Sequence, residues 1–334
     1  MLYLAPRAAG WSVNAVRALT SLVKQLDGYG TGDVIHVHWT SPIVQNAESE
    51  IQARDLLRAF QAGVDGALAR GASLIWTVHE ATLPGCRYPE LELELVQFLG
   101  DRAHEIHLLT PHAEAEIEQH LGSSAAKFRR PRHASFAGIY DDSSARSDAR
   151  RRWEIEESET VVLIPVRGET AVDVDLFCDA VQRANLTAER IVLLVAAEQA
   201  GVERGSLIPA DSKNVRVIHS QMPPADESSQ DWFAAADVMT FLNASSPRVE
   251  DVLRAATFGV PSIVPGSEYL RRQFGAEQWV QFFDAQEAFR ALSSLVVGFT
   301  RDDLLNKAAK AFAYEYTLHD MSRDFLARLN LAIA

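Results

Sequence analysis

Short apolar runs alternate with longer amphipathic stretches along almost the whole chain. In the first half the apolar runs cover residues 1–6, 33–39, 74–80 and 105–110. Runs of this length predict strands, and the stretches between them, where apolar residues recur every three or four positions, predict helices. Strict alternation of strand and helix favours parallel strands, because parallel neighbours need a long crossover between them.

A second series of the same kind follows a break in the pattern. Residues 133–152 are rich in Ser and Asp, and we expect them to form a domain linker and the approach to a new helix. Further strands are predicted at residues 160–166, 190–197, 215–220, 237–243 and 261–265. Helical spacing returns between these strands and over the C-terminal end of the chain. The sequence therefore predicts an α/β protein with two doubly wound, Rossmann-like halves.

Two histidines stand where neighbouring strands are predicted to end. His38 lies near the end of the run 33–39, and His79 near the end of the run 74–80. Ligands of doubly wound sheets bind at the carboxyl ends of the strands, so both side chains are candidates for a site. The alternative is that each histidine only caps its strand. His36 lies inside its run and is expected to be a core histidine.

The composition is typical of a globular protein of the reducing cytoplasm. The chain has 334 residues, enough for two domains, with two cysteines and a formal net charge of −13. The cysteine count excludes a disulfide scaffold, and the acidic charge argues against general nucleic-acid binding. No apolar run approaches the ~20 residues of a membrane span, and we expect no signal peptide.

One segment reverses the acidic average. Residues 127–152 carry eight Lys or Arg residues against three Asp residues. Either this segment is a solvated stretch between domains, or it is a basic patch that faces anionic lipid head groups or a phosphorylated ligand. The second interpretation predicts peripheral contact with the inner face of the membrane.

Recognisable motifs lie in both halves of the chain. They read D-V-I-H-V-H-W at 33–39, W-T-V-H at 76–79, H-A-S-F at 133–136, W-F-A-A-A-D at 232–237 and A-A-T-F-G-V-P at 255–261. Together they resemble GT-B glycosyltransferases, which use nucleotide-sugar donors and often act in bacterial exopolysaccharide or glycolipid assembly. The resemblance implies an acceptor-side domain at 1–142, a nucleotide-sugar domain at 143–315, and a helix at 316–334 that packs back on the first domain.

The same resemblance implies the activity. We expect a cytoplasmic hexosyltransferase that moves a sugar from a nucleotide-sugar donor to a carbohydrate or glycolipid acceptor, between two domains that face a cleft. The donor is then a substrate, and no cofactor is expected. No metal site is expected either, because H-E-x-x-H is absent and the D-x-D at 173–175 suits the start of a helix. The sequence does not identify the donor base, the acceptor or the oligomeric state. A protein partner or a homo-oligomer is compatible with the sequence.

Residues that would hold the donor lie in the second half. The leaving nucleoside diphosphate gains negative charge, which guanidinium groups and backbone amides at helix starts stabilise. The candidates are Arg167, Gly168, Ser245, Ser246, Arg248 and Glu250. Of these, Arg167 is the one that we expect to clamp phosphate directly.

Residues for the acceptor and for proton transfer lie in the first half. His79 beside Glu80 is the leading candidate for acid/base chemistry or for positioning a hydroxyl, because an imidazole next to a carboxylate is versatile near neutral pH. His38 is the next candidate. On the acceptor side the candidates are Gly10, Trp11, Trp39, His112 and His133.

Three positions depart from the family's donor motifs. Two glutamates of retaining members correspond here to Ser246 and Arg254, and a phosphate-binding lysine corresponds to Thr170. Arginine only donates hydrogen bonds, so it cannot accept them from ribose hydroxyls, and we expect Arg254 to pair with Glu250 one turn earlier. These departures support a second hypothesis, a degenerate subunit that binds and stabilises a partner transferase. A third hypothesis is a sugar-nucleotide epimerase, which would need no acceptor.

The Arg167→Ala variant tests the donor assignment. We expect it to weaken nucleotide binding by at least ~1.5 kcal/mol, the lower end for a hydrogen bond to a charged group. Isothermal titration calorimetry measures the change. An unchanged affinity would remove Arg167 from the donor site.

Overall fold

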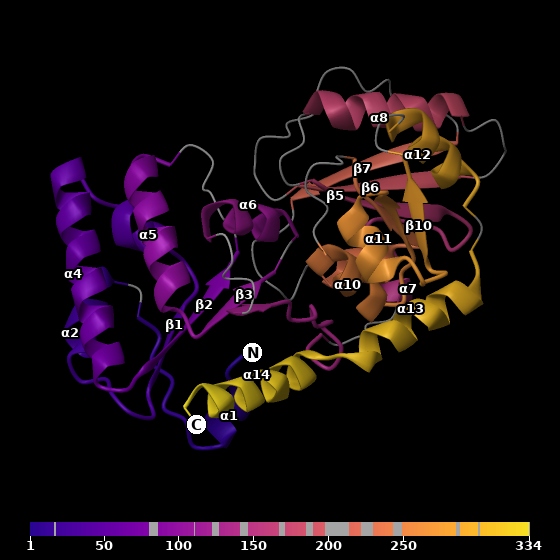
Figure 1. Cartoon of the computed structure of the whole chain (residues 1–334). Coiled ribbons are helices and arrows are strands. Elements are labelled where there is room, and N and C mark those ends of the chain that lie inside the picture. The colour runs from indigo at the N-terminus through magenta and orange to yellow at the C-terminus, as the bar shows by residue number, and fades with distance from the viewer. Residues whose placement is uncertain are drawn as a thin grey trace. The chain divides into compact units, whose positions relative to one another are not determined.

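The computed structural model divides the chain into two compact units (Figure 1). The first unit comprises Met1–His133 and His319–Ala334, and the second comprises Ala134–Leu318. The structure describes all residues except 17, 80–85, 110, 122–126, 141–145, 167–170, 185–189, 198–213, 222–229, 243–248, 285–287, 300 and 334. Each unit has a sheet and a hydrophobic core of its own.

The resemblance predicts domain boundaries after residues 142 and 315. The chain enters the second unit at Ala134 and leaves it at Leu318. Ser135 accounts for the earlier entry, because its backbone N–H donates to the Tyr316 carbonyl at 3.0 Å and its hydroxyl donates to the Ala313 carbonyl. Residues 134–140 are thereby joined to the end of the second unit.

The first unit has one parallel sheet with the strand order β1-β2-β3-β4. The strands are β1 (Val34–Val37), β2 (Ser73–Val78), β3 (Glu105–Leu108) and β4 (Phe128–Arg129). The helices are α1 (Leu4–Ala8), α2 (Leu19–Leu26), α3 (Ser41–Val44), α4 (Glu50–Ala69), α5 (Pro89–Arg102), α6 (Pro111–Leu121) and α14 (Leu318–Ala332). The strands predicted at 33–39, 74–80 and 105–110 are thus confirmed.

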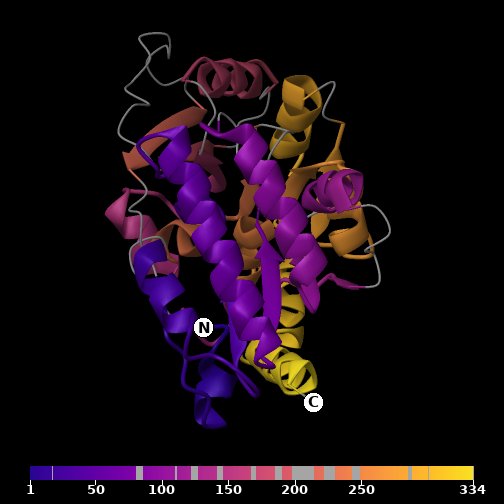
Figure 2. The ribbon, with the colours of Figure 1, turned by 60° about the vertical axis from the view of Figure 1, so that its left-hand side comes forward.

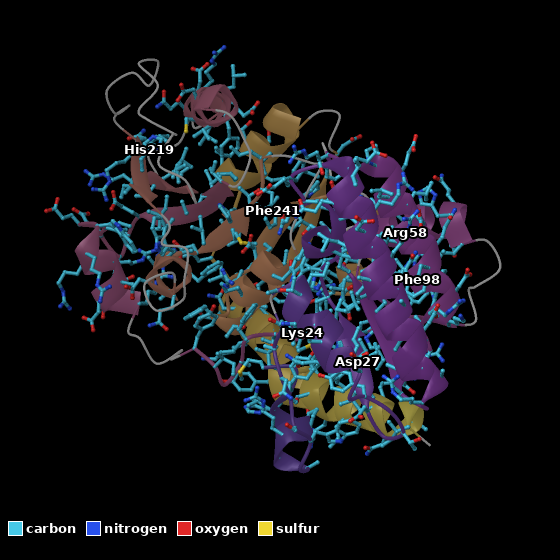
Figure 3. The ribbon with its side chains drawn as sticks, turned by 90° about the vertical axis from the view of Figure 1, so that its left-hand side faces the viewer. Lys24, Asp27, Arg58, Phe98, His219 and Phe241 are labelled. Carbon is cyan, nitrogen blue, oxygen red and sulfur yellow. The ribbon has the colours of Figure 1, made fainter. Side chains whose placement is uncertain are left out.

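One face of this sheet is apolar and lies under α4 and α5 (Figure 2). Its side chains are Ile35, Val37, Leu74, Trp76, Val78, Ile106 and Leu108. On α5, Phe98 approaches α4, with its ring centroid 6.2 Å from that of Phe60, whereas Arg58 lies on the outer side of α4 (Figure 3). The burial of this face is the hydrophobic contribution that holds the first unit together.

The opposite face of the same sheet is largely polar. It carries His36, His38, Thr77, Glu105 and His107, because side chains two positions apart point to the same side of a strand. The C-terminal helix α14 covers this face, with an apolar cluster of Ile75, Phe325, Leu329 and Ala332. The predicted return of the last helix to the first domain is therefore confirmed.

The strand predicted at residues 1–6 is wrong. Leu4–Ala8 form the short helix α1, in which Pro6 suits a first turn because its fixed φ is helical and its missing N–H would have no partner there. Contact with α14 holds this segment in place, because Ser322 Oγ accepts from the Ala5 N–H and donates to the Leu2 carbonyl, each at 2.8 Å.

The second unit has a parallel sheet with the strand order β10-β9-β8-β5-β6-β7. The strands are β5 (Thr160–Val166), β6 (Ile191–Ala197), β7 (Val215–Gln221), β8 (Val238–Thr240), β9 (Ser262–Pro265) and β10 (Val280–Phe283). The helices are α7 (Arg146–Arg152), α8 (Ala171–Ala184), α9 (Gln230–Ala235), α10 (Val249–Thr257), α11 (Glu268–Phe274), α12 (Ala288–Val297) and α13 (Asp303–Glu315). Phe241 is buried just after β8 (Figure 3). The five predicted strands are confirmed, while β10 was not predicted.

The part of the linker at 146–152 is a helix that packs on the second unit through two buried residues, Ala149 and Arg150. Arg150 is 1% exposed, and its guanidinium donates to Asp237 Oδ2 at 2.6 Å. Arg146 also donates to Asp237, and Arg301 Nε lies 2.9 Å from Asp237 Oδ1. The interpretation of 127–152 as one solvated or lipid-facing stretch is therefore wrong for Arg150, which is enclosed.

Asp237 is the common acceptor of these three guanidinium groups and of the Val161 N–H, which lies 2.7 Å from Oδ2. We expect Asp237→Asn to destabilise the second unit by about 3–5 kcal/mol, because Arg150 keeps its charge and loses its buried counter-charge. Urea unfolding measures the loss. The control is Asp148→Asn, since Asp148 is 58% exposed in its pair with Arg151 and should contribute less than about 1 kcal/mol. Equal effects of the two substitutions would contradict this role of Asp237.

Candidate active site

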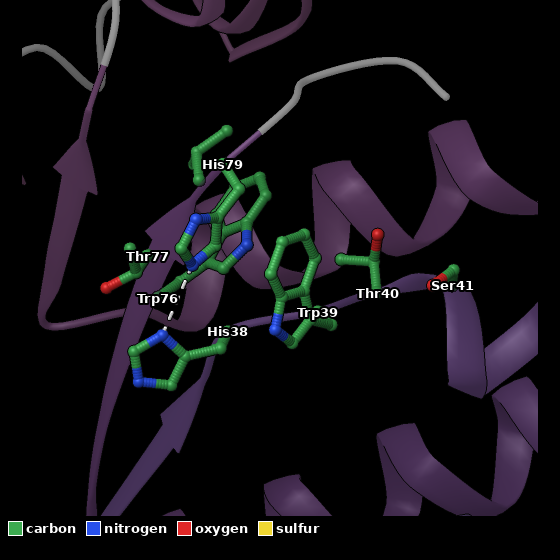
Figure 4. Close-up of a pocket in the computed structure, with 8 residues that line it drawn as sticks. His38, Trp39, Thr40, Ser41, Trp76, Thr77 and His79 are labelled. Atoms are coloured by element: carbon green, nitrogen blue, oxygen red, sulfur yellow. Dashed lines mark hydrogen bonds between the residues drawn. The ribbon is translucent and has the colours of Figure 1, made fainter. Parts of the chain in front are cut away.

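A small hollow opens where β1 and β2 end in the first unit (Figure 4). Its lining residues are His38, Trp39, Thr40, Ser41, Trp76, Thr77, Val78 and His79. The space is about 270 Å³ when the open solvent at its mouth is included, but the enclosed part is only about 10 Å³, room for about one water molecule. The hollow alone would therefore hold only part of a large substrate.

Trp39 forms one wall of the hollow with an exposed ring. The indole stacks on the imidazole of His79, with ring centroids 4.2 Å apart and an interplanar angle of 12°. Trp39 is nevertheless 58% exposed. A large aromatic ring that is stacked on one side and still exposed offers a platform for a flat, partly apolar ligand.

Hydrogen bonds to a buried carboxylate fix the loop after Trp39. Thr40 Oγ1 donates to Glu92 Oε1 at 2.5 Å, and Gln45 Nε2 donates to Glu92 Oε2 at 2.7 Å. Glu92 is 3% exposed on α5. The loop that carries Trp39 is thus anchored to a helix of the opposite, apolar side of the sheet.

A continuous set of hydrogen bonds, the histidine chain, runs from the middle of the sheet to the hollow. Thr77 Oγ1 lies 2.8 Å from His36 Nε2, and the Tyr3 hydroxyl lies 2.9 Å from His36 Nδ1 and 2.8 Å from His38 Nε2. His38 Nδ1 then lies 3.3 Å from His79 Nε2 (Figure 4). These five residues come from the N-terminal segment and from β1 and β2.

Burial keeps the interior members of the chain neutral. It lowers the pKa of His36 well below 6.5, and the neighbouring histidines lower it further. Burial and the nearby His79 and His107 lower the pKa of His38 to about 4. Burial also raises the pKa of the Tyr3 hydroxyl to about 12. Near neutral pH these groups therefore exchange hydrogen bonds without carrying charge.

A buried carboxylate lies beside the histidine chain on the same face of the sheet. Glu105 is 3% exposed; its Oε2 lies 3.2 Å from His107 Nε2, and its Oε1 lies 3.0 Å from Arg129 Nε and 3.3 Å from Arg328 Nη1. Burial alone would raise the pKa of Glu105, but His107 and the two guanidinium groups lower it below its usual value. Arg328 thereby anchors α14 to the sheet through a charge.

Of the residues predicted for the acceptor and for proton transfer, the structure brings three together. His38, Trp39 and His79 line the same hollow. Gly10 and Trp11 do not line the hollow. Gly10 has a positive φ of 94°, and Trp11 packs against the apolar cluster under α14.

Other predicted residues lie elsewhere or outside the described residues. His133 lies at the end of the first unit, with Nε2 2.9 Å from the Leu109 carbonyl. Glu250 is exposed at the start of α10, where it adds to the effect of burial in raising the pKa of Tyr269. Nothing is described of Glu80, Arg167, Gly168, Ser245, Ser246 and Arg248, nor of the side chain of His112.

Sequence reasoning missed Tyr3 and Thr77 and treated His36 as a core residue. His36 lies on the polar face of the sheet, mostly buried, and has a hydrogen-bond partner at each ring nitrogen. The spacing H-x-H in β1 and T-x-H at the end of β2 contains the signal, because residues two apart share one face of a strand. Tyr3 gives no such signal, because it reaches the sheet through the tertiary contact between α1 and α14.

Arg254 is held by contacts within the second unit. Its Nη1 lies 3.6 Å from Asp251 Oδ1, so the ion pair joins it to Asp251 and not to the predicted Glu250. The guanidinium carbon lies 4.9 Å from the ring centroid of Phe136 and 5.9 Å from those of Tyr140 and Phe233. Cation–π contacts and an ion pair give this arginine a structural role.

Neither a metal cluster nor a membrane-spanning helix occurs among the described residues. No group of three or more His, Cys, Asp or Glu side chains there is arranged to hold a metal ion. No helix in the same part of the chain is long and apolar enough to cross a bilayer.

The low pKa of His38 predicts a pH-dependent stability. Since the folded pKa, about 4, lies below the ordinary 6.5, the unfolded chain binds a proton that the folded chain does not. The stability that the neutral His38 contributes to the fold is therefore complete above pH 6.5 and is lost as the pH falls towards 4. Urea unfolding measures the free energy of unfolding at about pH 7.5 and at about pH 5. The decrease between these two pH values should be smaller for His38→Gln than for wild type by at least ~1 kcal/mol.

The exposed His104 provides the control for this experiment, because His104→Gln should leave the pH dependence of wild type unchanged. Parallel stability curves for wild type and His38→Gln would contradict the neutral, buried state of His38.

Comparison with known proteins identifies the fold. No protein family matches the sequence, and neither does any curated protein. Among solved structures, Anabaena HepE in complex with UDP and glucose is similar over 93% of this chain and 81% of its own, with 13% identity and a TM-score of 0.63.

Two further structures match at similar levels. A glycosyltransferase from Rickettsia africae covers 97% of this chain and 84% of its own, with 10% identity and a TM-score of 0.62. Sucrose-phosphate synthase from Thermosynechococcus elongatus covers 95% and 79%, with 14% identity and a TM-score of 0.59. At such low identity these similarities concern the fold. The chain has the fold of the GT-B glycosyltransferases, with two parallel-sheet α/β domains.

Proposed function

We propose that the protein is a glycosyltransferase that moves a hexose from a nucleotide-sugar donor to a carbohydrate or glycolipid acceptor. The observation that carries the proposal is the match over 93% of the chain to HepE, whose structure holds UDP and glucose. A fold alone does not define an activity, so the chemistry must come from the site. The hollow at the ends of β1 and β2 supplies residues suited to it.

Trp39 supports a sugar as the ligand of the hollow. Sugar rings present an apolar face of C–H groups, which packs on aromatic rings, and hydroxyls at their edges, which need hydrogen-bonding partners. Trp39 offers an exposed ring, and Ser41 and His79, which also line the hollow, carry a hydroxyl and an imidazole. We assign this hollow to the acceptor, one sugar unit of which would pack on the exposed ring of Trp39 at the open side of the hollow.

The donor is assigned to the second unit. A uridine diphosphate sugar is the first candidate, because HepE is similar over most of its length and has been solved with UDP and with UDP-glucose. Arg167 and the amides near Gly168 and Ser245 are the proposed phosphate contacts. A guanidinium group can hold two phosphate oxygens at once, which stabilises the charge that develops on the leaving diphosphate.

The cellular setting follows from the same proposal. An enzyme that draws on nucleotide sugars to build polysaccharide or glycolipid would work in the cytoplasm, at the inner face of the membrane when its acceptor is a lipid. Lys127, Arg130 and Arg132 in the first unit are the cations of the basic segment that we propose for such peripheral contact.

A second candidate is a GT-B-like subunit that binds and stabilises a partner transferase. The observation that favours it is Arg254, which stands where the retaining enzymes have a glutamate. Its side chain is 16% exposed, is paired with Asp251 and lies over three aromatic rings. A residue so engaged has taken a packing role, as expected if donor chemistry has been lost.

Assays with UDP-hexoses separate these candidates. We expect the wild-type protein to release UDP from at least one donor in the presence of oligosaccharide or lipid-linked acceptors, with product detected by mass spectrometry. His79→Ala should lower kcat by about 100-fold, the lower end of what a positioned acid, base or hydrogen-bond donor contributes. Circular dichroism and the melting temperature should stay close to wild type, since His79 lies at the rim of the sheet.

His104→Ala is the matched control and should retain wild-type turnover. A large loss of melting temperature in His79→Ala would make His79 structural. Absence of transfer across UDP-, GDP-, ADP- and TDP-sugars would contradict the enzyme and favour the binding subunit.

A further inference from the structure

The number of hydrogens in the histidine chain restricts how its bonds can be directed. A tyrosine hydroxyl has one hydrogen, so Tyr3 can donate to only one of His36 and His38 and must accept from the other if both bonds form. A neutral imidazole carries one N–H and one bare nitrogen, so a histidine that accepts at one nitrogen donates at the other. The chain is therefore directional, and reversing one bond reverses all of them.

Thr77 decides the direction. Thr77 borders the hollow but is only 5% exposed as a residue, and within the described part of the chain the hydrogen-bond partner of its hydroxyl is His36 Nε2. If His36 donated to Thr77, the threonine hydrogen would have no acceptor among the described residues and little access to water, which costs free energy. The arrangement that uses every hydrogen has Thr77 donating to His36 Nε2.

The remaining bonds follow in order. His36 then carries its hydrogen on Nδ1 and donates it to the Tyr3 oxygen, and Tyr3 donates to His38 Nε2. His38 in turn carries its hydrogen on Nδ1 and donates it to His79 Nε2. His79 receives a hydrogen bond at Nε2, so its own hydrogen is on Nδ1.

We infer that the histidine chain holds His79 as the neutral tautomer protonated on Nδ1, with Tyr3 and Thr77 as the positioning residues that set this state. In the proposed glycosyl transfer, on which this role rests, His79 is then a hydrogen-bond donor at Nδ1 and not a base. The groups that suit it are oxygens that accept, such as a sugar hydroxyl or a phosphate oxygen.

Charged groups around the chain are compatible with its neutral state. Among the described residues, the titratable groups that face it are His107 and Glu105 on β3, and Arg129 and Arg328 are paired with the other carboxylate oxygen of Glu105. The Glu105 carboxylate is already neutralised by the two guanidinium groups. Glu105 therefore does not stabilise a protonated His36 or His38, and the burial of these two histidines favours the uncharged ring.

Nitrogen-15 NMR of the unliganded protein tests the tautomer directly, because protonated and bare ring nitrogens have well-separated shifts. With all ten histidines labelled, the His79 signals are assigned by their loss in His79→Gln. Near pH 7.5 we expect Nδ1 of His79 to be protonated and Nε2 to be bare. A protonated Nε2 would overturn the inference.

Two pairs of variants test the positioning residues. Thr77→Val and Tyr3→Phe each remove a hydroxyl and should shift the His79 signals towards a mixture of both tautomers. Thr77→Ser keeps the hydroxyl and should retain the wild-type tautomer, as should Tyr29→Phe, whose hydroxyl bonds to Gln25 away from the chain. Unchanged His79 signals in both Thr77→Val and Tyr3→Phe would overturn the coupling.

Turnover distinguishes this inference from the proposed function. Once a donor and acceptor are known, His79→Asn, whose amide nitrogen can replace Nδ1 as a donor, should retain at least tenfold more kcat than His79→Gln, whose amide nitrogen replaces Nε2. The reverse order would overturn the donor role. Absence of transfer by the wild-type protein with every donor would refute the glycosyltransferase and leave the NMR result to decide the tautomer alone.

Discussion

The structure of the first unit depends on covering the polar face of its parallel sheet. Parallel strands are usually apolar on both faces because helices bury both. Here β1, β2 and β3 place His36, His38, Thr77, Glu105 and His107 on one face. Burying such groups costs free energy unless each finds a partner. The two ends of the chain supply partners for this polar face: Tyr3 provides a hydroxyl between two histidines, and Arg328 provides a positive charge for Glu105.

This requirement explains why the N-terminal segment and α14 pack together. Ser322 joins them by accepting from the Ala5 N–H and donating to the Leu2 carbonyl, which places Tyr3 over the sheet. Phe325 stacks on His36, with ring centroids 5.1 Å apart. The last helix therefore belongs to the first unit although it follows the second in sequence, and the geometry of the hollow depends on residues more than three hundred positions apart.

Local patterns in the sequence were sufficient to predict most strands and the two histidines at the carboxyl ends of β1 and β2. The apolar runs ending at His38 and His79 predicted two neighbouring strands, and parallel pairing placed both histidines beside one hollow. The same reasoning failed where distant contacts decide. Residues 1–6 form a helix because of Ser322, and Arg150 is buried because Asp237 lies beneath it. Neither partner is visible from the local pattern.

The donor side shows the same limit. Arg254 was expected to pair with Glu250 by helical spacing, but its position also depends on Phe136 and Phe233, which come from other segments of the second unit. Aromatic contacts of this kind carry no periodic signal. Spacing on one helix therefore identified the arginine but not its partner.

Nucleotide binding tests the central claim most directly. We would measure the melting temperature with UDP, GDP, ADP, TDP and CMP and their common sugars. A ligand at 100 times its dissociation constant stabilises the folded state by about 2.7 kcal/mol, which corresponds to a shift of several degrees. A clear shift with UDP or a UDP-sugar is the predicted result. No shift with any nucleotide would contradict a donor site in the second unit and leave the protein as a binding subunit of another transferase.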